Sequence, residues 1–304
     1  MGIGAVEPAR TLQLRLGALG AAAIRLWLRL FGRTVEKSAL SWLLGPIGPD
    51  DVEIGARPYE IVAEREGLTI DRSGQDAGLV PDFDLLTGPS FDATRTDPAV
   101  RRFYEHTCRY DLDGWSESPF PGRLFLWLIV YTVSRAMNQL NFPVFGLDLS
   151  RGLTSEVLPL RDASGRAVHT GWYRRVKGSG RVIYTGFYTT VRPPGHDGRC
   201  VKVVFPLPRG NATVILKPGF DRQGRFTLTS AGSSFGDAGF YRLLELDERR
   251  LKVMHLRSLQ ERFTVFRDES GELRCDHLVR YLGLTMLRLH YRMRERSRSD
   301  VRSG

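Results

Sequence analysis

Residues 200–216 read CVKVVFPLPRGNATVIL, and this stretch decides the fold class. Its first half alternates, so that Val201, Val203 and Phe205 fall on one side of an extended chain. From Thr154 onward, short runs rich in Val, Ile, Phe, Tyr and Thr recur about every eight to twelve residues, with turn residues between them. This pattern predicts an all-β body built as a sandwich or a barrel.

The predicted strands are joined by short turns. Residues 177–180 read KGSG and predict a hairpin turn, with glycine where a positive φ angle is needed. Residues 221–224 and 268–271 predict two further turns. The runs that carry the strand prediction are residues 168–174, 181–192, 200–207, 212–216, 226–230, 251–256 and 263–266.

The last strand is predicted over residues 284–294. Apolar and polar residues alternate there without exception for about ten residues, which favours a strand. A helix is the alternative, because its spacing would line up Leu278, Leu282, Met286, Leu289 and Met293 on one face.

Roughly nine or ten such strands would leave an exposed edge unless the sheet closed on itself. Antiparallel barrels of about eight to ten strands can hold one small ligand in their mouths. Several predicted strands carry Tyr or Thr opposite their aliphatic side. The sequence therefore predicts an α+β, mainly β fold: an antiparallel β-barrel with a partly polar interior and with apolar and basic helices on its N-terminal side.

Three blocks resemble those of uncharacterised bacterial proteins: VRRFYEHT at residues 100–107, KVVFPLP at 202–208 and GLTMLRLHYRM at 283–293. The strand pattern resembles lipocalin-like, calycin-type barrels. Gly171–Trp172 corresponds to the Gly-x-Trp motif of lipocalins with one residue fewer. The resemblance implies a barrel fold, and it implies no activity and no catalytic residues.

The N-terminal segment is basic and amphipathic. No acid occurs between residues 9 and 35. In a helix, Arg15, Arg25, Arg29 and Arg33 would lie within about 80° of one another, beside a broad apolar side that includes Trp27. This pattern is typical of a helix that lies on a lipid or hydrophobic surface, so we expect these five residues to contact a membrane. A signal peptide over residues 10–23 is the alternative.

The chain divides into three predicted segments. Residues 1–48 form the basic amphipathic helical segment, which ends at the helix breakers of residues 45–50. Residues 49–91 form a linker with a short β region at 59–63 and 68–70, followed by a solvated acidic loop. Residues 92–304 form the barrel-like ligand-binding domain, with a short helix that begins near Asp97 and one flanking apolar helix at about 124–140.

The net charge of +10 is unevenly spread. Acids outnumber bases by 15 to 7 in residues 51–120, and bases outnumber acids by 31 to 16 in residues 121–304. This separation indicates either an internal match of charge or an anionic partner. The three cysteines have no paired spacing, which favours a reducing compartment and no metal site. We therefore expect a cytoplasmic protein, peripheral on the inner face of the membrane.

The densest polar cluster is residues 104–117. As an active site it would supply His106 as a base and Asp111 or Glu117 as a general acid, with Trp115 as an apolar wall that raises a carboxyl pKa. The alternative is the end of a helix followed by a strand edge with solvated acids.

The candidate ligand-binding residues lie mostly in the β region. Arg151 could pair with a carboxylate or phosphate head group, although an internal ion pair with Asp148 is the alternative. The remaining candidates are a strand histidine, two tyrosines that flank Gly186, and the tryptophan of the polar cluster: His255, Tyr184, Tyr188 and Trp115.

These patterns predict a membrane-associated protein that binds a hydrophobic small molecule or lipid in a β-barrel. An isomerase, hydratase or cyclase that uses the same interior is the first alternative. A nucleic-acid-binding protein that uses the arginines of residues 292–302 is the second. The chain has no glycine-rich phosphate loop, no Gly-x-Ser-x-Gly and no His-Glu-x-x-His, so we expect no cofactor and no metal.

Overall fold

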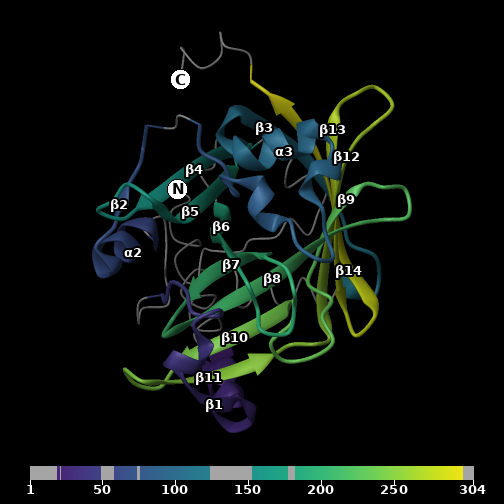
Figure 1. Ribbon diagram of the computed structural model, residues 1–304. Helices are drawn as coiled ribbons and strands as arrows, with labels where there is room; N and C mark the ends of the chain where they lie inside the picture. Colours follow the sequence, from purple (N-terminus) through teal and green to yellow (C-terminus); the bar gives the residue numbers. More distant parts are fainter. Residues whose placement is uncertain are drawn as a thin grey trace, which may run out of the picture.

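The computed structural model describes residues 19–20, 22–48, 58–73, 76–123, 153–176 and 182–296 (Figure 1). Antiparallel strands make up about half of these residues and helices are few, which confirms the predicted α+β, mainly β class. The strands are β1 (Arg33–Glu36), β2 (Thr69–Ile70), β3 (Tyr110–Glu117), β4 (Leu153–Arg161), β5 (Ala167–Val176), β6 (Val182–Val191), β7 (Cys200–Leu207), β8 (Gly210–Phe220), β9 (Phe226–Thr229), β10 (Gly239–Glu245), β11 (Arg250–His255), β12 (Leu259–Arg267), β13 (Leu273–Tyr281) and β14 (Leu284–Glu295).

Helices are few and short. Residues 22–31 are helical ahead of β1. The other helices are α2 (Pro58–Glu66) and α3 (Pro98–Glu105), with the 3-10 turns η1 (Lys37–Leu40), η2 (Phe83–Leu86), η3 (Ala93–Arg95) and η4 (Thr107–Arg109). The helix predicted near Asp97 is confirmed as α3, because the Asp97 side chain accepts a hydrogen bond from the Ala99 backbone and Pro98 begins the helix.

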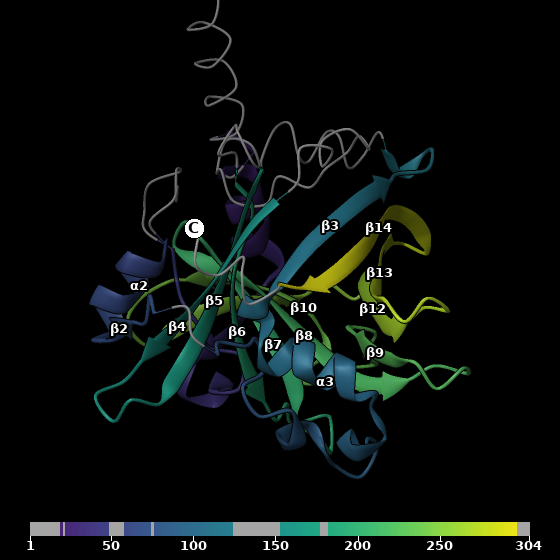
Figure 2. The same cartoon turned by 90° about the horizontal axis from the view of Figure 1, so that it is seen from above.

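The strands follow one long path, β2-β4-β5-β6-β7-β8-β9-β12-β13-β14-β3. A branch of β10, β11 and β1 leaves this path at β8, because the first half of β8 pairs with β10 and its second half pairs with β9. Seen from above, β4 to β7 form one side of a curved sheet and β12 to β14 with β3 form the other (Figure 2). Among the described residues no ladder joins β3 to β4, so the sheet is not closed.

The strand predicted at residues 68–70 is confirmed as β2, whereas the strand predicted at 59–63 is wrong. Residues 59–63 form helix α2, whose buried Tyr59, Val62 and Ala63 follow the spacing of a helix face. The Tyr59 ring lies against Gly171 of β5, where a Cβ would collide with it, and its hydroxyl donates to the Trp172 carbonyl at 2.9 Å. This docking against the sheet decides the local structure.

The acidic loop before residue 92 is only partly solvated, because Asp76, Asp82, Asp84 and Asp92 are exposed. Its apolar side chains are buried, including those of Leu79, Val80 and Phe83. Asp82 and Asp92 cap η2 and η3 through their side chains, so the backbone polar groups are satisfied locally while the apolar residues enter the core.

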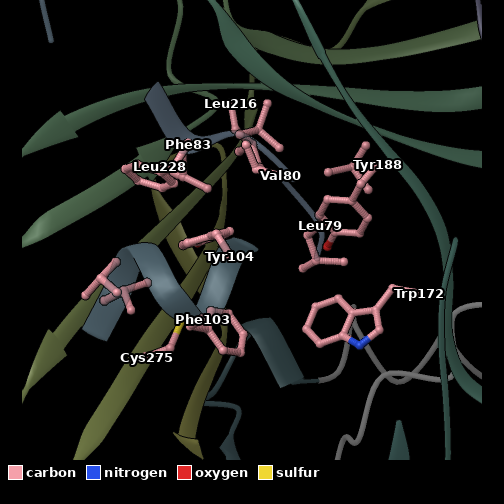
Figure 3. Close-up of a cluster of buried hydrophobic side chains, with 14 of the residues drawn as sticks. Leu79, Val80, Phe83, Phe103, Tyr104, Trp172, Tyr188, Leu216, Leu228 and Cys275 are labelled. Atoms are coloured by element: carbon pink, nitrogen blue, oxygen red, sulfur yellow. The ribbon is translucent and has the colours of Figure 1, made fainter. Parts of the chain in front are cut away.

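The main core lies between this loop, α3 and the inner face of the curved sheet. Figure 3 shows Phe103 and Tyr104 of α3 opposite Trp172 and Tyr188 of the β5–β6 wall. Apolar side chains of the protein itself therefore fill the part of the described interior that lies between α3 and the sheet.

The strand predictions from residue 168 onward agree with β5 to β9, β11 and β12, and residues 284–294 form strand β14 instead of a helix. Five strands were not predicted: β1, which lies in the segment 1–48 predicted as helical, and β3, β4, β10 and β13. The predicted helix at 124–140 and the turn at 177–180 lie outside the described residues.

Candidate functional site

The two tyrosines predicted from the sequence lie together on the inner face of β6. The Tyr184 and Tyr188 hydroxyl oxygens are 2.6 Å apart, and either hydroxyl can donate to the other. Gly186 lies between them on the same face of the strand, opposite Trp172 of β5. A Cβ at residue 186 would approach the Tyr184 hydroxyl oxygen to 3.0 Å, so glycine leaves the space that these rings occupy.

Arg174 shares this inner face of β5 and is paired in register with Tyr184. Only 4% of the residue is exposed. Its guanidinium carbon lies 5.0 Å from the centre of the Trp172 ring and 4.9 Å from that of the Tyr291 ring. No carboxylate of the described residues forms an ion pair with it, and its Nε and Nη2 atoms are buried without a hydrogen-bond partner. Buried arginines usually have an acidic partner, so this one is unusual.

The opposite wall is formed by β12, β13 and β14. Register pairing places Phe263 opposite His277, and His277 opposite Leu289, on the same inner face as Tyr291. The His277 Nε2 atom lies 3.7 Å from the Glu261 carboxylate, and its ring stacks on Phe263 with centroids 3.9 Å apart. The two walls thus bring an arginine, an acid, a histidine and three tyrosines to one interior.

The tyrosine hydroxyls of this interior stay protonated. Burial raises the pKa of Tyr184 and Tyr188 well above the ordinary value for tyrosine. Burial also raises the pKa of Tyr291, against a smaller lowering effect of Arg174. All three hydroxyls are therefore neutral hydrogen-bond donors at physiological pH.

Small residues stand where the two walls meet. Arg174 is paired in register with Ser155 of β4, and Tyr291 with Gly114 of β3. A Cβ at residue 114 would lie 2.9 Å from the Tyr291 ring, so this ring needs a glycine below it. The contact between Arg174 and Tyr291 therefore links the two walls where no described backbone ladder joins them.

The candidate catalytic residues of the polar cluster do not converge on this interior. Asp111 and Glu117 alternate with the buried residues of β3 and are exposed. The Arg296 Nε atom donates to Asp111 at 2.9 Å. His106 lies at the end of α3, 3.5 Å from Asp76. His106 therefore lies at a helix end, and Asp111 and Glu117 lie on the exposed face of β3.

Two candidate ligand-binding residues also lie elsewhere. Trp115 is 47% exposed on the outer face of β3 and stacks on His290. His255 lies on β11, in the branch of the sheet, and stacks on Tyr241 with centroids 4.5 Å apart. Arg151 lies outside the described residues, as does Arg15 of the predicted membrane helix.

Arg174, Trp172 and Tyr291 were missed as candidates. Alternation along residues 168–174 puts Trp172 and Arg174 on the same side of the strand, next to the predicted tyrosine strand. That alternation was the signal that could have found them.

Among the described residues, no group of three His, Cys, Asp or Glu side chains is placed to hold a metal ion. The three cysteines are not in disulfide bonds. In the described part of the chain, no helix combines the length and apolar character needed to cross a bilayer. Comparisons with family models, curated proteins and solved structures found no match to this chain.

Proposed function

We propose that this chain is a membrane-associated binding protein for a hydrophobic small molecule or lipid, which it holds against the inner face of the curved sheet. One observation carries the proposal. Aromatic rings and neutral hydroxyls of Trp172, Tyr184, Tyr188 and Tyr291 surround a buried guanidinium that has no acid partner among the described residues. Ligand sites are mostly apolar, with a few polar groups that fix orientation.

The proposal includes a barrel whose seam lies between β3 and β4. Ten strands follow one another from β4 to β3 along the path of the sheet. These two strands also approach each other to within 8 Å between Cα atoms. A barrel of this size has room for side chains or one small ligand.

The membrane part of the proposal rests on the helix at residues 22–31. Leu28 is 1% exposed and anchors this helix, whereas Trp27, Leu30 and Phe31 are exposed. Arg29 and Arg33 are exposed as well. An apolar surface beside arginines fits an anionic bilayer, and we propose the cytoplasmic face of the membrane as the location.

Binding of a hydrophobic molecule is tested with the neutral fluorophore N-phenyl-1-naphthylamine and the full-length protein. We expect saturable binding that Trp172→Ala weakens several-fold, because an inner aromatic wall is lost. The matched control is Trp115→Ala, which removes an exposed tryptophan from the outer face of β3. Absence of saturable binding, or equal effects of the two variants, contradicts the proposal.

Membrane association is tested by sedimentation of the full-length protein with phosphatidylglycerol vesicles. Each arginine near an anionic surface contributes about 1 kcal/mol, so Arg29→Glu/Arg33→Glu should weaken binding more than tenfold. The control Arg222→Glu/Arg262→Glu makes the same change of charge at two exposed residues outside the helix, in the β8–β9 turn and on β12. Equal binding by the two double variants would refute the role of the helix.

An enzyme remains the second candidate, because the Glu261–His277 pair could supply an acid and a base beside the tyrosine hydroxyls. Turnover of an apolar substrate that Glu261→Gln abolishes without loss of binding would favour it. For the nucleic-acid alternative, the described arginines Arg292 and Arg296 form ion pairs with the acids of β3, which favours an internal match of charge.

A further inference from the structure

We propose that the ligand of this inner face is an amphipathic monocarboxylic acid, whose carboxylate binds side-on to the Nε and Nη2 edge of Arg174. The inference rests on the proposed function and names its ligand class.

One edge of the Arg174 guanidinium has no hydrogen-bond partner. The nitrogens without a hydrogen-bond partner are Nε and Nη2. In a planar guanidinium, the N–H groups of these two atoms lie on the same edge and are parallel to each other. Two parallel donors match the two oxygens of one carboxylate. The Trp172 and Tyr291 rings lie beside the same guanidinium, and a hydrogen bond with Arg174 lowers the Tyr291 pKa against the larger effect of burial. The Nε and Nη2 edge is the part of the guanidinium that is buried without a hydrogen-bond partner.

The next residue, Arg175, differs from Arg174 in having an acidic partner. Arg175 has the same side chain one position further along β5, and it forms an ion pair with Glu156. Its side chain is 38% exposed. The chain thus supplies an acid to the arginine that faces outward and supplies none, among the described residues, to the arginine that faces inward.

Glu261 of the opposite wall is not the partner of Arg174. Glu261 also faces the interior, but its ion-pair partner within 4.0 Å is His277. Glu261 is a further negative charge on the inner face, and it repels a dianionic head group such as a phosphate monoester more strongly than a monoanion. A single negative charge balances Arg174. We therefore favour a carboxylate.

Neutral hydroxyl groups also line the inner face near the ends of the sheet. The Ser155 hydroxyl accepts a hydrogen bond from Trp172 Nε1 at 2.8 Å, so its own hydrogen is available to a second acceptor. Ser116 of β3 has a buried hydroxyl oxygen without a partner. Neutral donors and aromatic rings around one cation suit a ligand with one anionic end and an apolar remainder.

The test compares ligands that share a chain and differ in the head group. Dodecanoate, dodecan-1-ol and dodecyl phosphate compete with N-phenyl-1-naphthylamine for the full-length protein at about pH 7.5. We expect dodecanoate to bind at least tenfold more tightly than the alcohol, since a charge-assisted bidentate contact exceeds 1.4 kcal/mol. Dodecyl phosphate should bind less tightly than dodecanoate.

The variants assign this preference to one side chain. Arg174→Met should bind dodecanoate and the alcohol equally, and Arg174→Lys should keep part of the preference because it keeps the charge without the fork. The control Arg175→Met should keep all of it. Circular dichroism checks that each variant is folded.

Three outcomes overturn the inference. Equal affinities for acid and alcohol in the wild type remove the need for an anion site. A preference that persists in Arg174→Met assigns the site to another residue. Tighter binding of dodecyl phosphate corrects the head group. Failure of all three ligands to displace the fluorophore would instead count against the proposed function itself.

Discussion

Replacing Arg174 by methionine should leave the ligand-free protein as stable as the wild type or more stable. Two buried guanidinium N–H groups without acceptors each cost about 1–3 kcal/mol. The cation–π contacts with Trp172 and Tyr291 contribute roughly 0.5–2 kcal/mol each in the opposite direction. A methionine would recover part of these contacts through its sulfur. The expected change in the free energy of unfolding is therefore between zero and a gain of about 2 kcal/mol.

The assay is urea unfolding followed by far-ultraviolet circular dichroism, because tryptophan emission would respond to the altered contact of Trp172. An unchanged slope against urea shows that only stability has changed. Arg175→Met is the control, and loss of its partly exposed ion pair should cost less than about 1 kcal/mol. Dodecanoate at about 100 times its wild-type Kd should stabilise the wild type by roughly 2.7 kcal/mol, and Arg174→Met by at most roughly 1.4 kcal/mol because its Kd is expected to be at least tenfold higher. A loss of more than about 2 kcal/mol in the ligand-free variant would show that Arg174 supports the fold, and this result would refute the reasoning.

Three further predictions concern the interior and the turns. Tyr184→Phe and Tyr188→Phe should each destabilise the protein by about 1–3 kcal/mol in urea unfolding, because each strands the other buried hydroxyl. The double variant should cost less than the sum, and additivity would contradict the 2.6 Å contact. Hydrogen bonds from Ser270, and then from Arg274, lower the pKa of Asp268 to about 2. This value lies below the unfolded value near 3.9, so the contribution to stability is complete above about pH 4 and is lost as the pH falls toward 2. Asp268→Asn should therefore flatten the fall of Tm over that range, and a wild-type slope would contradict this. Burial raises the pKa of the Cys200 and Cys275 thiols to about 12, so a disulfide reagent at about pH 8 should modify at most Cys108 in the native protein and all three thiols in urea. Rapid reaction of a second thiol in the native state would be inconsistent with that burial.

Strands dominated by β-branched and aromatic residues, such as β6 and β7, were predictable, and strands interrupted by charged residues, such as β3 and β13, were not. β13 alternates Leu273, Cys275 and His277 inward, and the polar histidine hides the period of two. β3 alternates as well, but its exposed acids beside His106 also fit a catalytic cluster, and this pattern obscured the strand. The period places Asp111 and Glu117 on the outer face, where Arg296 reaches Asp111.

The candidate site was partly predictable for the same reason. Tyr184 and Tyr188 are four residues apart in a strand, so they must share a face, and Gly186 between them marks a space that rings can fill. Alternation places Arg174 and Arg175 on opposite sides of the strand, but the local sequence does not show which side faces inward. Register with Tyr184 and Ser155 decides that Arg174 faces inward, and this register depends on residues far along the chain.

Arg174 lies next to the junction of β3 and β4, and this position gives a physical reason for ligand binding there. β3 and β4 approach each other without a described ladder, and the contact that crosses between the walls is made by Arg174 and Tyr291 over Ser155 and Gly114. Larger residues at these two positions would separate the rings from the charge. A carboxylate bound to the free edge of Arg174 would neutralise the buried cation and accept hydrogen bonds from neutral donors of both walls. Binding would thereby provide the hydrogen-bond acceptor that the described chain does not supply to Arg174, and would add an electrostatic link between the two ends of the sheet, β3 and β4, which no described ladder joins.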